Sequence, residues 1–427
     1  MVENKWSELF KPLQIGNVVL KNRLIMAPMS AFGPVKEGFV ADQTVAFFEE
    51  RAKHGIGLII VGGSVATTMG WKGAPMTRNL LRLDGDKFVP GLRRVTEAAH
   101  RHHVPIFVQL VPTWGAISKP GPYHVGASPV PLVTAEENLS TGLTIPGGLS
   151  LPAPRAATID EIKAIEQEVV QTVHRMRNAG FDGVELGAHM NYFLTGFLSP
   201  RTNLRTDEYG GNAENRARVV TDILRAIRAE IGPNYPVGVR MPVNEHLPDG
   251  IGPEEFGELA VLFQDAGASY IAMTDASYAV MKLATADKDM NIIEHGEAKI
   301  FREKVSIPLL MHGVHHPDNI LTAVADGHCD GVMMARPLLA DPAYPAKLRE
   351  GKAAEVIHCD RQNLCLRRNF INLPIRCSAN PRTGFESHPA DQRHTIGMKL
   401  QALTESALLW VTTKRPLMRI IMKLAAR

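Results

Sequence analysis

Eight short apolar segments recur along the chain, and they constrain its fold more than any other feature. Each is apolar at nearly every position instead of alternating with polar residues. That pattern is typical of strands that are covered on both faces of a parallel sheet. The segments are residues 23–28, 57–63, 105–110, 183–187, 236–241, 270–275, 307–313 and 331–336.

Helical patterns fill the intervals between these segments. The clearest covers residues 158–180, where Thr158 and Glu161 match a capping box and Gly180 provides a stop. Another helix is expected to begin at Pro253. Strands that alternate with helices predict an α/β fold, namely a (β/α)8 TIM barrel with a C-terminal extension. A doubly wound sheet is the alternative, but no G-x-G-x-x-G pattern follows the first strand.

Composition excludes several classes of protein. With 427 residues, 45% hydrophobic and 21% charged, the chain is long enough to bury a large core. We expect a cytoplasmic protein, because the N-terminus lacks the apolar stretch of a signal peptide and no apolar run suits a bilayer-spanning helix. Four cysteines do not suggest a disulfide scaffold and fit a reducing compartment.

The C-terminal tail, residues 395–427, differs in charge from the rest of the chain. It carries six basic residues against Glu405 alone, whereas the net charge of the whole chain is only +3. A nearly neutral body with a basic tail does not suggest a nucleic-acid binder. The tail is expected to be helical and interrupted before Pro416. Contact with a membrane surface or an acidic partner is one interpretation; packing against the barrel or another subunit is the one we favour.

Small, amide and basic residues follow the expected strands, where barrels carry their functional groups. Each has an ordinary structural explanation when taken alone, such as a turn glycine or a surface ion pair. Together they describe a site for a flat ligand that bears a phosphate and develops negative charge, and flavin mononucleotide (FMN) fits. The residues are Met29, Ser30, Gly62, Gly63, Gln109, Arg240, Gly313 and Arg336.

Several of these stretches resemble the old yellow enzyme-type FMN oxidoreductases (the NADH:flavin oxidoreductase family), closest to the 2,4-dienoyl-CoA reductase branch. The resemblance covers roughly residues 7–386, and "FLSPRTNLRTDEYGGNAENRARVV" at 197–220 is its most specific part. It implies an FMN barrel that reduces activated C=C bonds with NADH or NADPH. The cofactor residues that it implies are Ala27, Met29, Ser30, Gly63, Gln109, Arg240, Gly313, Ala335 and Arg336.

The resemblance is weaker on the substrate side. Gly187 and Met190 stand where many relatives have the pair of polar residues that grip a substrate carbonyl. Tyr192 matches the proton-donating tyrosine, and Tyr278 best matches a histidine that assists in the dienoyl-CoA reductase branch. A shift of one residue would bring His189 into the gripping pair. The predicted catalytic residues are therefore Tyr192, His189 and Tyr278, with Asn191 a further candidate to polarise the carbonyl.

Two other functions are compatible with these residues. One is a flavin dehydrogenase or demethylase on the same barrel, which would oxidise an amine or alcohol. The other is a flavin-binding protein with a decayed active site, which the altered Gly187 and Met190 favour. We expect the reductase to act on a small unsaturated substrate and not to bind nucleic acid. A homo-oligomeric state is a further expectation.

The cysteines after the barrel match an iron–sulfur region incompletely. Dienoyl-CoA reductases have four cysteine ligands there, and this chain supplies Cys359, Cys365 and Cys377. We expect a degenerate region without a cluster or other metal; a three-cysteine or histidine-assisted cluster is the alternative. Cys329 is expected to be structural. We expect no FAD- or NAD-binding domain after this region, so reduced nicotinamide would reach FMN directly or electrons would come from a separate protein. The expected divisions are residues 1–350, 351–390 and 391–427.

Overall fold

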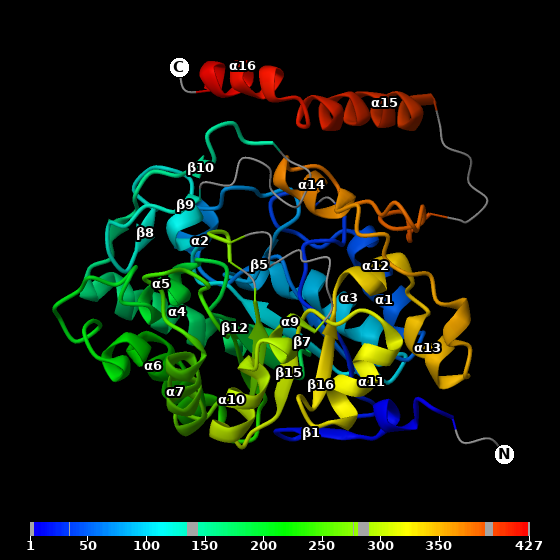
Figure 1. The fold of residues 1–427 in the computed structure, drawn as a ribbon, viewed down its shortest axis with the longest axis horizontal. Coiled ribbons are helices and arrows are strands. Elements are labelled where there is room, and N and C mark those ends of the chain that lie inside the picture. Colours follow the sequence, from blue (N-terminus) through cyan, green and yellow to red (C-terminus); the bar gives the residue numbers. More distant parts are fainter. Residues whose placement is uncertain are drawn as a thin grey trace.

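The eight apolar segments form one closed barrel of parallel strands (Figure 1). The computed structural model of the chain describes residues 4–33, 35–134, 144–275, 277–280, 290–388 and 396–425, with the backbone alone for 396–402 and 422–425. The closed ring of eight parallel strands confirms the predicted barrel. In chain order its strands are β3 (Leu24–Met26), β4 (Leu58–Val61), β7 (Ile106–Leu110), β12 (Gly183–Gly187), β13 (Val237–Pro242), β14 (Tyr270–Thr274), β15 (Leu309–Met311) and β16 (Gly331–Met334).

The ring closes between its first and last strands, where Met333 pairs with Ile25 in parallel register. Ile25, Phe107 and Leu310 belong to a hydrophobic cluster inside the barrel, which an N-terminal hairpin of β1 (Leu13–Ile15) and β2 (Val18–Leu20) extends. Alternate strand residues pack outward against the helices. This double burial explains why the strands are apolar at nearly every position.

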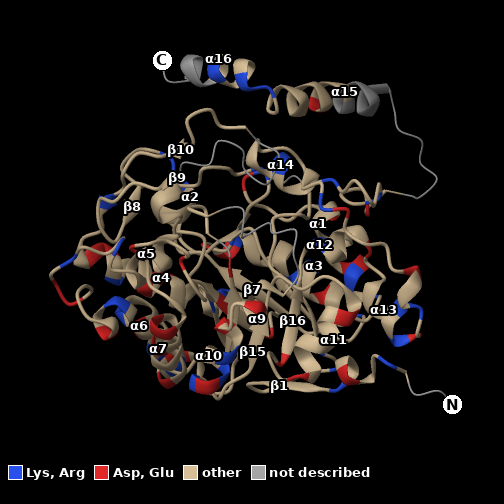
Figure 2. Cartoon of the chain, in the orientation of Figure 1, with Lys and Arg blue, Asp and Glu red and all other residues tan. Residues whose placement is uncertain are grey.

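Helices surround the barrel, and most charged side chains lie on them or on the connecting loops (Figure 2). The expected helix after residue 158 is α4 (Ile159–Asn178), with the capping box between Thr158 and Glu161 in place. The helix predicted to begin at Pro253 does so and is α7 (Pro253–Asp265). The other main helices are α1 (Asp42–Ala52), α3 (Val89–His100), α6 (Ala213–Ile231), α10 (Glu297–Lys304) and α11 (Pro317–Ala325).

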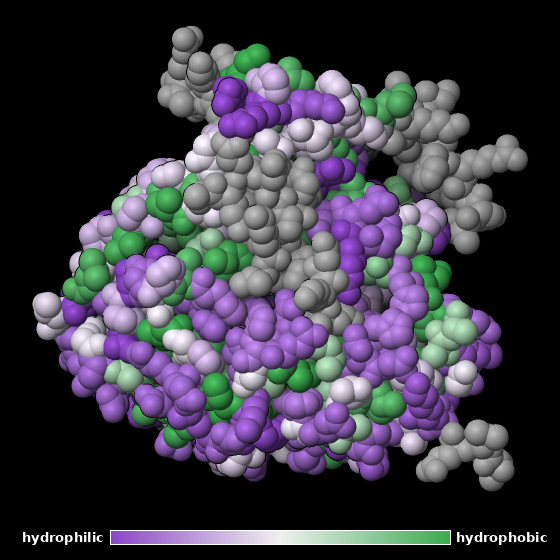
Figure 3. Space-filling view, in the orientation of Figure 1, coloured by the Kyte–Doolittle hydropathy of each residue, from purple (hydrophilic) through white to green (hydrophobic). Residues whose placement is uncertain are grey.

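Two further parts follow the barrel in the chain. The first contains α12 (Arg336–Ala340), α13 (Tyr344–Arg349) and α14 (Leu364–Phe370). The second is the tail, with α15 (Ile396–Val411) and α16 (Arg415–Ala425) separated just before Pro416 as expected. The tail lies across the top of the molecule, above α14 (Figure 1). Hydrophobic and hydrophilic side chains lie next to one another along its described part (Figure 3).

None of the helices in the described ranges is long and apolar enough to cross a membrane. The four cysteines are all free thiols in the structure. Residues 391–395 and 426–427 of the expected tail segment lie outside the described residues. The boundaries expected at 350 and 390 remain predictions, and the contacts of the post-barrel segment with the barrel are described with the site below.

Candidate active site

A cavity with a volume of about 290 Å³ opens at the end of the barrel where the strands terminate. Most of the site residues predicted from the sequence line it; Ala27, Gly62 and Asn191 do not. The fold thus brings together residues from all eight strand ends. The predicted residues in its wall are Met29, Ser30, Gly63, Gln109, His189, Tyr192, Arg240, Tyr278, Gly313, Ala335 and Arg336.

Ala27 does not line the cavity. It is fully buried, and its amide donates a hydrogen bond to the carbonyl of Met334 at 3.0 Å. This bond continues the pairing of β3 with β16 past the end of the strand. The prediction that its backbone faces the cofactor is not supported by this placement, because a ladder hydrogen bond already uses the amide.

Charged and polar side chains form the floor of the cavity. Glu185, in the middle of β12, is fully buried and accepts hydrogen bonds from Gln109 Nε2 (2.7 Å) and the Tyr270 hydroxyl (3.1 Å). Burial raises the pKa of Glu185, and the charge of Arg240 opposes this effect. Burial also lowers the pKa of the Arg240 guanidinium, which nonetheless remains protonated. The floor therefore places a fixed positive charge at the end of β13.

Sequence reasoning overlooked the role of Glu185. A carboxylate within a continuously apolar strand is the signal that could have identified it, because buried carboxylates need partners. With one amide hydrogen donated to Glu185, Gln109 is held in a single orientation at the cavity wall.

The three predicted catalytic residues lie side by side. The ring of Tyr192 is 5.3 Å from that of His189 and 6.3 Å from that of Tyr278, between centroids. Tyr192 and Tyr278 also share a hydrogen bond. Burial, and then the neighbouring Tyr278, raise the pKa of Tyr192 well above its usual 10. Burial, and then Arg240, lower the pKa of His189 well below 6.5, so a protonated phenol faces a neutral imidazole.

A strained turn connects this group to the barrel. Met190 and Asn191 both have left-handed backbone conformations, with φ of 56° and 55°. Asn191 Oδ1 accepts hydrogen bonds from Ser277 Oγ (3.0 Å) and the Tyr278 amide (2.9 Å). Asn191 does not line the cavity, and its suggested role on the substrate carbonyl stays a prediction. It joins the loop after β12 to the loop after β14 and thereby sets the position of Tyr278.

The structure adds two residues to the site that the sequence did not single out. His312 follows β15 and is partly buried, and its buried Nε2 atom has no partner among the described residues. Burial, and then the charge of Arg240, lower its pKa well below 6.5. Asp275 follows β14 and accepts a 2.5 Å hydrogen bond from His246 through Oδ1, whereas its buried Oδ2 has no such partner. Both lie at the carboxyl ends of expected strands, and this position is the signal that could have identified them.

The opposite end of the cavity suits a phosphate group. Gly313 has φ of 90°, and a Cβ placed on it would have open space around it, so a ligand can approach the backbone there. Arg336 begins α12 and donates from Nη1 to Asn363 Oδ1 at 3.0 Å. Leu366 and Asn369 of α14 line the same cavity. The post-barrel segment is therefore part of the site.

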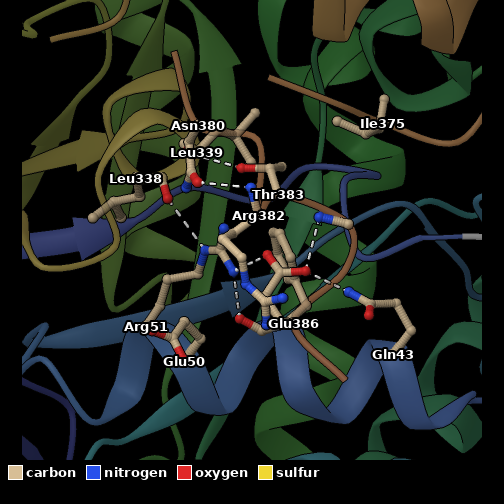
Figure 4. Close-up of polar contacts among 12 residues, drawn as sticks. Gln43, Glu50, Arg51, Leu338, Leu339, Ile375, Asn380, Arg382, Thr383 and Glu386 are labelled. Carbon is tan, nitrogen blue, oxygen red and sulfur yellow. Dashed lines mark hydrogen bonds and ion pairs between the residues drawn. The ribbon is translucent and has the colours of Figure 1, made fainter. Parts of the chain in front are cut away.

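A buried ion pair connects the post-barrel segment to the barrel (Figure 4). Arg51 of α1 is fully buried and contacts Glu386 at 2.9 Å between Nη1 and Oε1. Arg51 Nε also donates to the carbonyl of Leu338 in α12, at 3.2 Å. Thr383 Oγ1 donates to the neighbouring Leu339 carbonyl at 2.8 Å. These bonds fix the helix that begins with Arg336.

The cysteines after the barrel are not arranged as a metal centre in the described part of the chain. Across the described ranges no group of three or more His, Cys, Asp or Glu side chains is arranged to hold a metal ion. Burial raises the pKa of Cys365 to about 11, against the opposing charge of Arg336, so this thiol keeps its proton. A [4Fe–4S] cluster needs thiolates from four cysteines, which the set Cys359, Cys365 and Cys377 does not fit. Cys329 is buried in the main core, as expected of a structural residue.

The donor set around the cavity fits FMN. Arg240 Nε and His312 Nε2 are buried polar atoms without partners among the described residues, and buried groups of this kind are usually satisfied by a ligand or water. Gly63 and Gly313 both have positive φ and leave backbone accessible at the strand ends. Arg240 and Arg336 supply positive charge at separate strands of the same cavity.

Comparison with known proteins places this site in a family. The sequence model of the NADH:flavin oxidoreductase / NADH oxidase family matches residues 8–355. An NADH oxidase of Thermoanaerobacter brockii is 32% identical over 389 residues, which cover 88% of this chain and 56% of that protein. An N,N-dimethylglycine/sarcosine dehydrogenase of Chromohalobacter salexigens is 27% identical, with coverage of 88% and 53%.

Solved structures agree with this placement. A 2-naphthoyl-CoA reductase, solved with 2-naphthoyl-CoA, superimposes with a TM-score of 0.79 and 27% identity over 90% of this chain and 58% of that one. The chain spans about half the length of the curated relatives that it matches.

Proposed function

The chain belongs to the NADH:flavin oxidoreductase / NADH oxidase family, and on that premise we propose that it is an FMN-dependent reductase of activated C=C bonds that uses NADH or NADPH. The observation that carries the proposal is the protonated hydroxyl of the partly buried Tyr192, which lines the same cavity as Arg240. A proton donor and a fixed cation in one cavity suit a reaction that adds a hydride and a proton to a double bond.

The residues that would hold FMN are those of the cavity floor and rim. Met29, Ser30, Gly63 and Gln109 would bind the flavin ring, and Gly313, Ala335 and Arg336 the phosphate. Bound FMN supplies the means to accept a hydride from reduced nicotinamide and to deliver one to the substrate. The chain's contribution is Arg240, a buried positive charge at the end of β13 that would stabilise negative charge on the bound cofactor.

Tyr192 would protonate the α-carbon of the substrate. Its raised pKa keeps the phenol protonated across the neutral range, and its hydrogen bond with Tyr278 orients the hydroxyl. His189 would polarise the substrate carbonyl as a neutral donor, because it lies beside Tyr192 and its buried Nδ1 has no partner in the described ranges. This assignment gives the carbonyl a partner although Gly187 and Met190 replace the family's usual pair.

The substrate class is a small molecule with a C=C bond conjugated to a carbonyl, either an enone or an enoyl thioester. Asp275 favours a second candidate, a dehydrogenase or demethylase that acts on an amine. Its unpartnered Oδ2 is an acceptor at the cavity wall, and an amine substrate presents the matching donor.

One set of measurements separates the two functions. The protein is purified, its bound cofactor is identified by absorbance and chromatography, and anaerobic bleaching of the flavin is followed with NADH, NADPH and N-methylated amines. We expect FMN, bleaching by a nicotinamide, and reoxidation by an enone or an enoyl thioester. Bleaching by an amine without nicotinamide would establish the dehydrogenase instead. A colourless protein that does not bind added FMN would refute both.

A further inference from the structure

The outer face of the tail exposes an unusual number of large apolar side chains. Half of the exposed large hydrophobic residues in the described ranges fall between residues 403 and 421. Their exposed fractions run from 42% to 67%. The other exposed large hydrophobic residues in the described ranges are scattered singly along the chain. They are Leu403, Leu408, Trp410, Ile420 and Ile421.

Basic side chains accompany these apolar residues on the same surface. Lys414, Arg415 and Arg419 are exposed, and the ammonium group of Lys414 lies 5.1 Å from the centre of the Trp410 ring. Glu405 is the single acidic residue of the tail, and it forms a buried ion pair with Arg368 of α14. The outer face is therefore both apolar and cationic.

The inner face of the tail is seated on the body of the molecule near the active site. Besides the pair with Glu405, the Thr412 carbonyl accepts a hydrogen bond from the Thr144 amide at 3.1 Å. Met418 of α16 is partly buried and packs against the same hydrophobic cluster as Met190 and Tyr278. These contacts turn the opposite face of both helices outward, above α14 (Figure 1).

We propose that the outer face of α15 and α16 docks on the surface of an anionic lipid bilayer. Surface-bound helices combine Leu, Ile and Trp with Lys and Arg, because acyl chains take up the former and lipid phosphates attract the latter. Neither helix is suited to cross the bilayer among the described residues. A second copy of the chain fits this face less well, since two cationic surfaces repel. Both tail helices also lie beyond the family match at 8–355, so the face is not a shared property of the barrel.

Docking in this orientation has a consequence for the site. The cluster that contains Met418 also contains Tyr278, so the bilayer would lie on the same side of the molecule as the cavity wall formed by α14. The proposal does not depend on the reaction, because the docking surface and the catalytic residues are different side chains.

The first experiment measures binding of the full-length protein to vesicles. Phosphatidylcholine vesicles with and without 30% phosphatidylglycerol are sedimented with the protein at low and high salt. We expect binding to the anionic vesicles that weakens with salt. Lys414→Glu/Arg419→Glu should weaken it by at least about tenfold, since each basic residue near an anionic surface contributes about fivefold. The control Lys163→Glu/Lys299→Glu makes the same charge change on α4 and α10 and should bind like the wild type.

The second experiment locates the contact. Brominated lipids quench tryptophans that enter the bilayer, and Trp410 is 58% exposed whereas Trp6 and Trp114 are buried. Quenching should disappear in Trp410→Phe. Leu408→Ser should reduce binding, and Leu204→Ser, which removes an even more exposed leucine from the barrel, should not.

Three outcomes would overturn the proposal. They are absence of binding to anionic vesicles, binding without quenching of Trp410, and equal loss of binding in the charge-reversed control. Self-association that Leu408→Ser abolishes, without vesicle binding, would identify the face as an interface between copies instead. Circular dichroism of each variant verifies that it is folded. None of these measurements requires turnover, so a failed enzymatic assignment leaves the test intact.

Discussion

Removal of a single hydroxyl group, by Tyr192→Phe, tests the assignment of the proton donor. The ring packs edge-on against Trp114, with 5.2 Å between centroids, and against His189, and phenylalanine preserves both contacts. The variant loses the hydrogen bond with Tyr278, which contributes about 1 kcal/mol to the free energy of unfolding. The protein should therefore fold and retain its cofactor.

The expected kinetic effect is much larger than this change in stability. A positioned general acid contributes about 10²–10⁴-fold to a rate, equivalent to about 3–5 kcal/mol in the activation barrier. The loss should fall on the half-reaction with the unsaturated substrate, whereas reduction of the flavin by nicotinamide should keep its rate. Stopped-flow absorbance under anaerobic conditions measures the two half-reactions separately.

Tyr235→Phe is the matched control. The Tyr235 hydroxyl is also partly buried and donates a 2.9 Å hydrogen bond to the Phe181 carbonyl, but Tyr235 does not line the cavity. This variant should lose a similar amount of stability. The rates of both half-reactions should be unchanged. An unchanged substrate half-reaction in Tyr192→Phe would refute the assignment, and an equal loss in Tyr235→Phe would reduce it to a loss of stability.

Three further predictions concern the surroundings of the site. Glu386→Ala leaves the fully buried Arg51 without its counter-charge and should lower the free energy of unfolding by about 3–5 kcal/mol in urea titrations. Arg336→Ala removes a charged donor from the phosphate end and should weaken FMN binding about 10- to 100-fold, measured by fluorescence titration of the apoprotein. Replacement of His246 by asparagine should alter the pH dependence of stability. Its hydrogen bond with Asp275 raises the pKa of His246 above 6.5 in the folded protein. The stabilisation is therefore complete below pH 6.5 and lost as the pH rises through the higher folded value, so the variant should be destabilised at pH 6 but not at pH 9.

Each of these predictions has a control. Glu161→Ala breaks a pair with Arg155 that is substantially exposed, and it should cost at most about 1 kcal/mol beyond the loss of the helix cap. Combination of Glu386→Ala with Arg51→Met should recover stability, because no buried charge remains; failure to recover would contradict the ion-pair explanation. Unaltered FMN affinity in Arg336→Ala would remove that residue from the phosphate site, and an equal loss of stability at both pH values would exclude titration of His246.

Local patterns predicted the elements of the fold well. The eight barrel strands and the bounds of α4 followed from apolar runs and a capping box, because burial on both faces and satisfaction of helix termini are properties of nearby residues. Barrel sites lie at strand ends, and this rule predicted residues for flavin binding that line one cavity, with Ala27 as the exception.

Other features could not follow from sequence spacing. Whether His189 or Met190 faces Tyr192 depends on a left-handed turn, and both line the cavity. Asn191 was expected near the substrate, but its side chain bonds to the loop that carries Tyr278, a partner 87 residues away. The post-barrel segment was treated as a separate region, yet Leu366 and Asn369 complete the cavity wall.

The sequence by itself determined the barrel strands and most of the strand-end residues that line the cavity, because each depends on patterns within a few residues. Only the tertiary structure decided which distant side chains meet. Arg51 and Glu386 are 335 positions apart, and they form a buried pair because closure of the barrel brings α1 beneath the post-barrel segment. Met418 shares a cluster with Tyr278 for the same reason: packing, and not spacing along the chain, places the tail above the site.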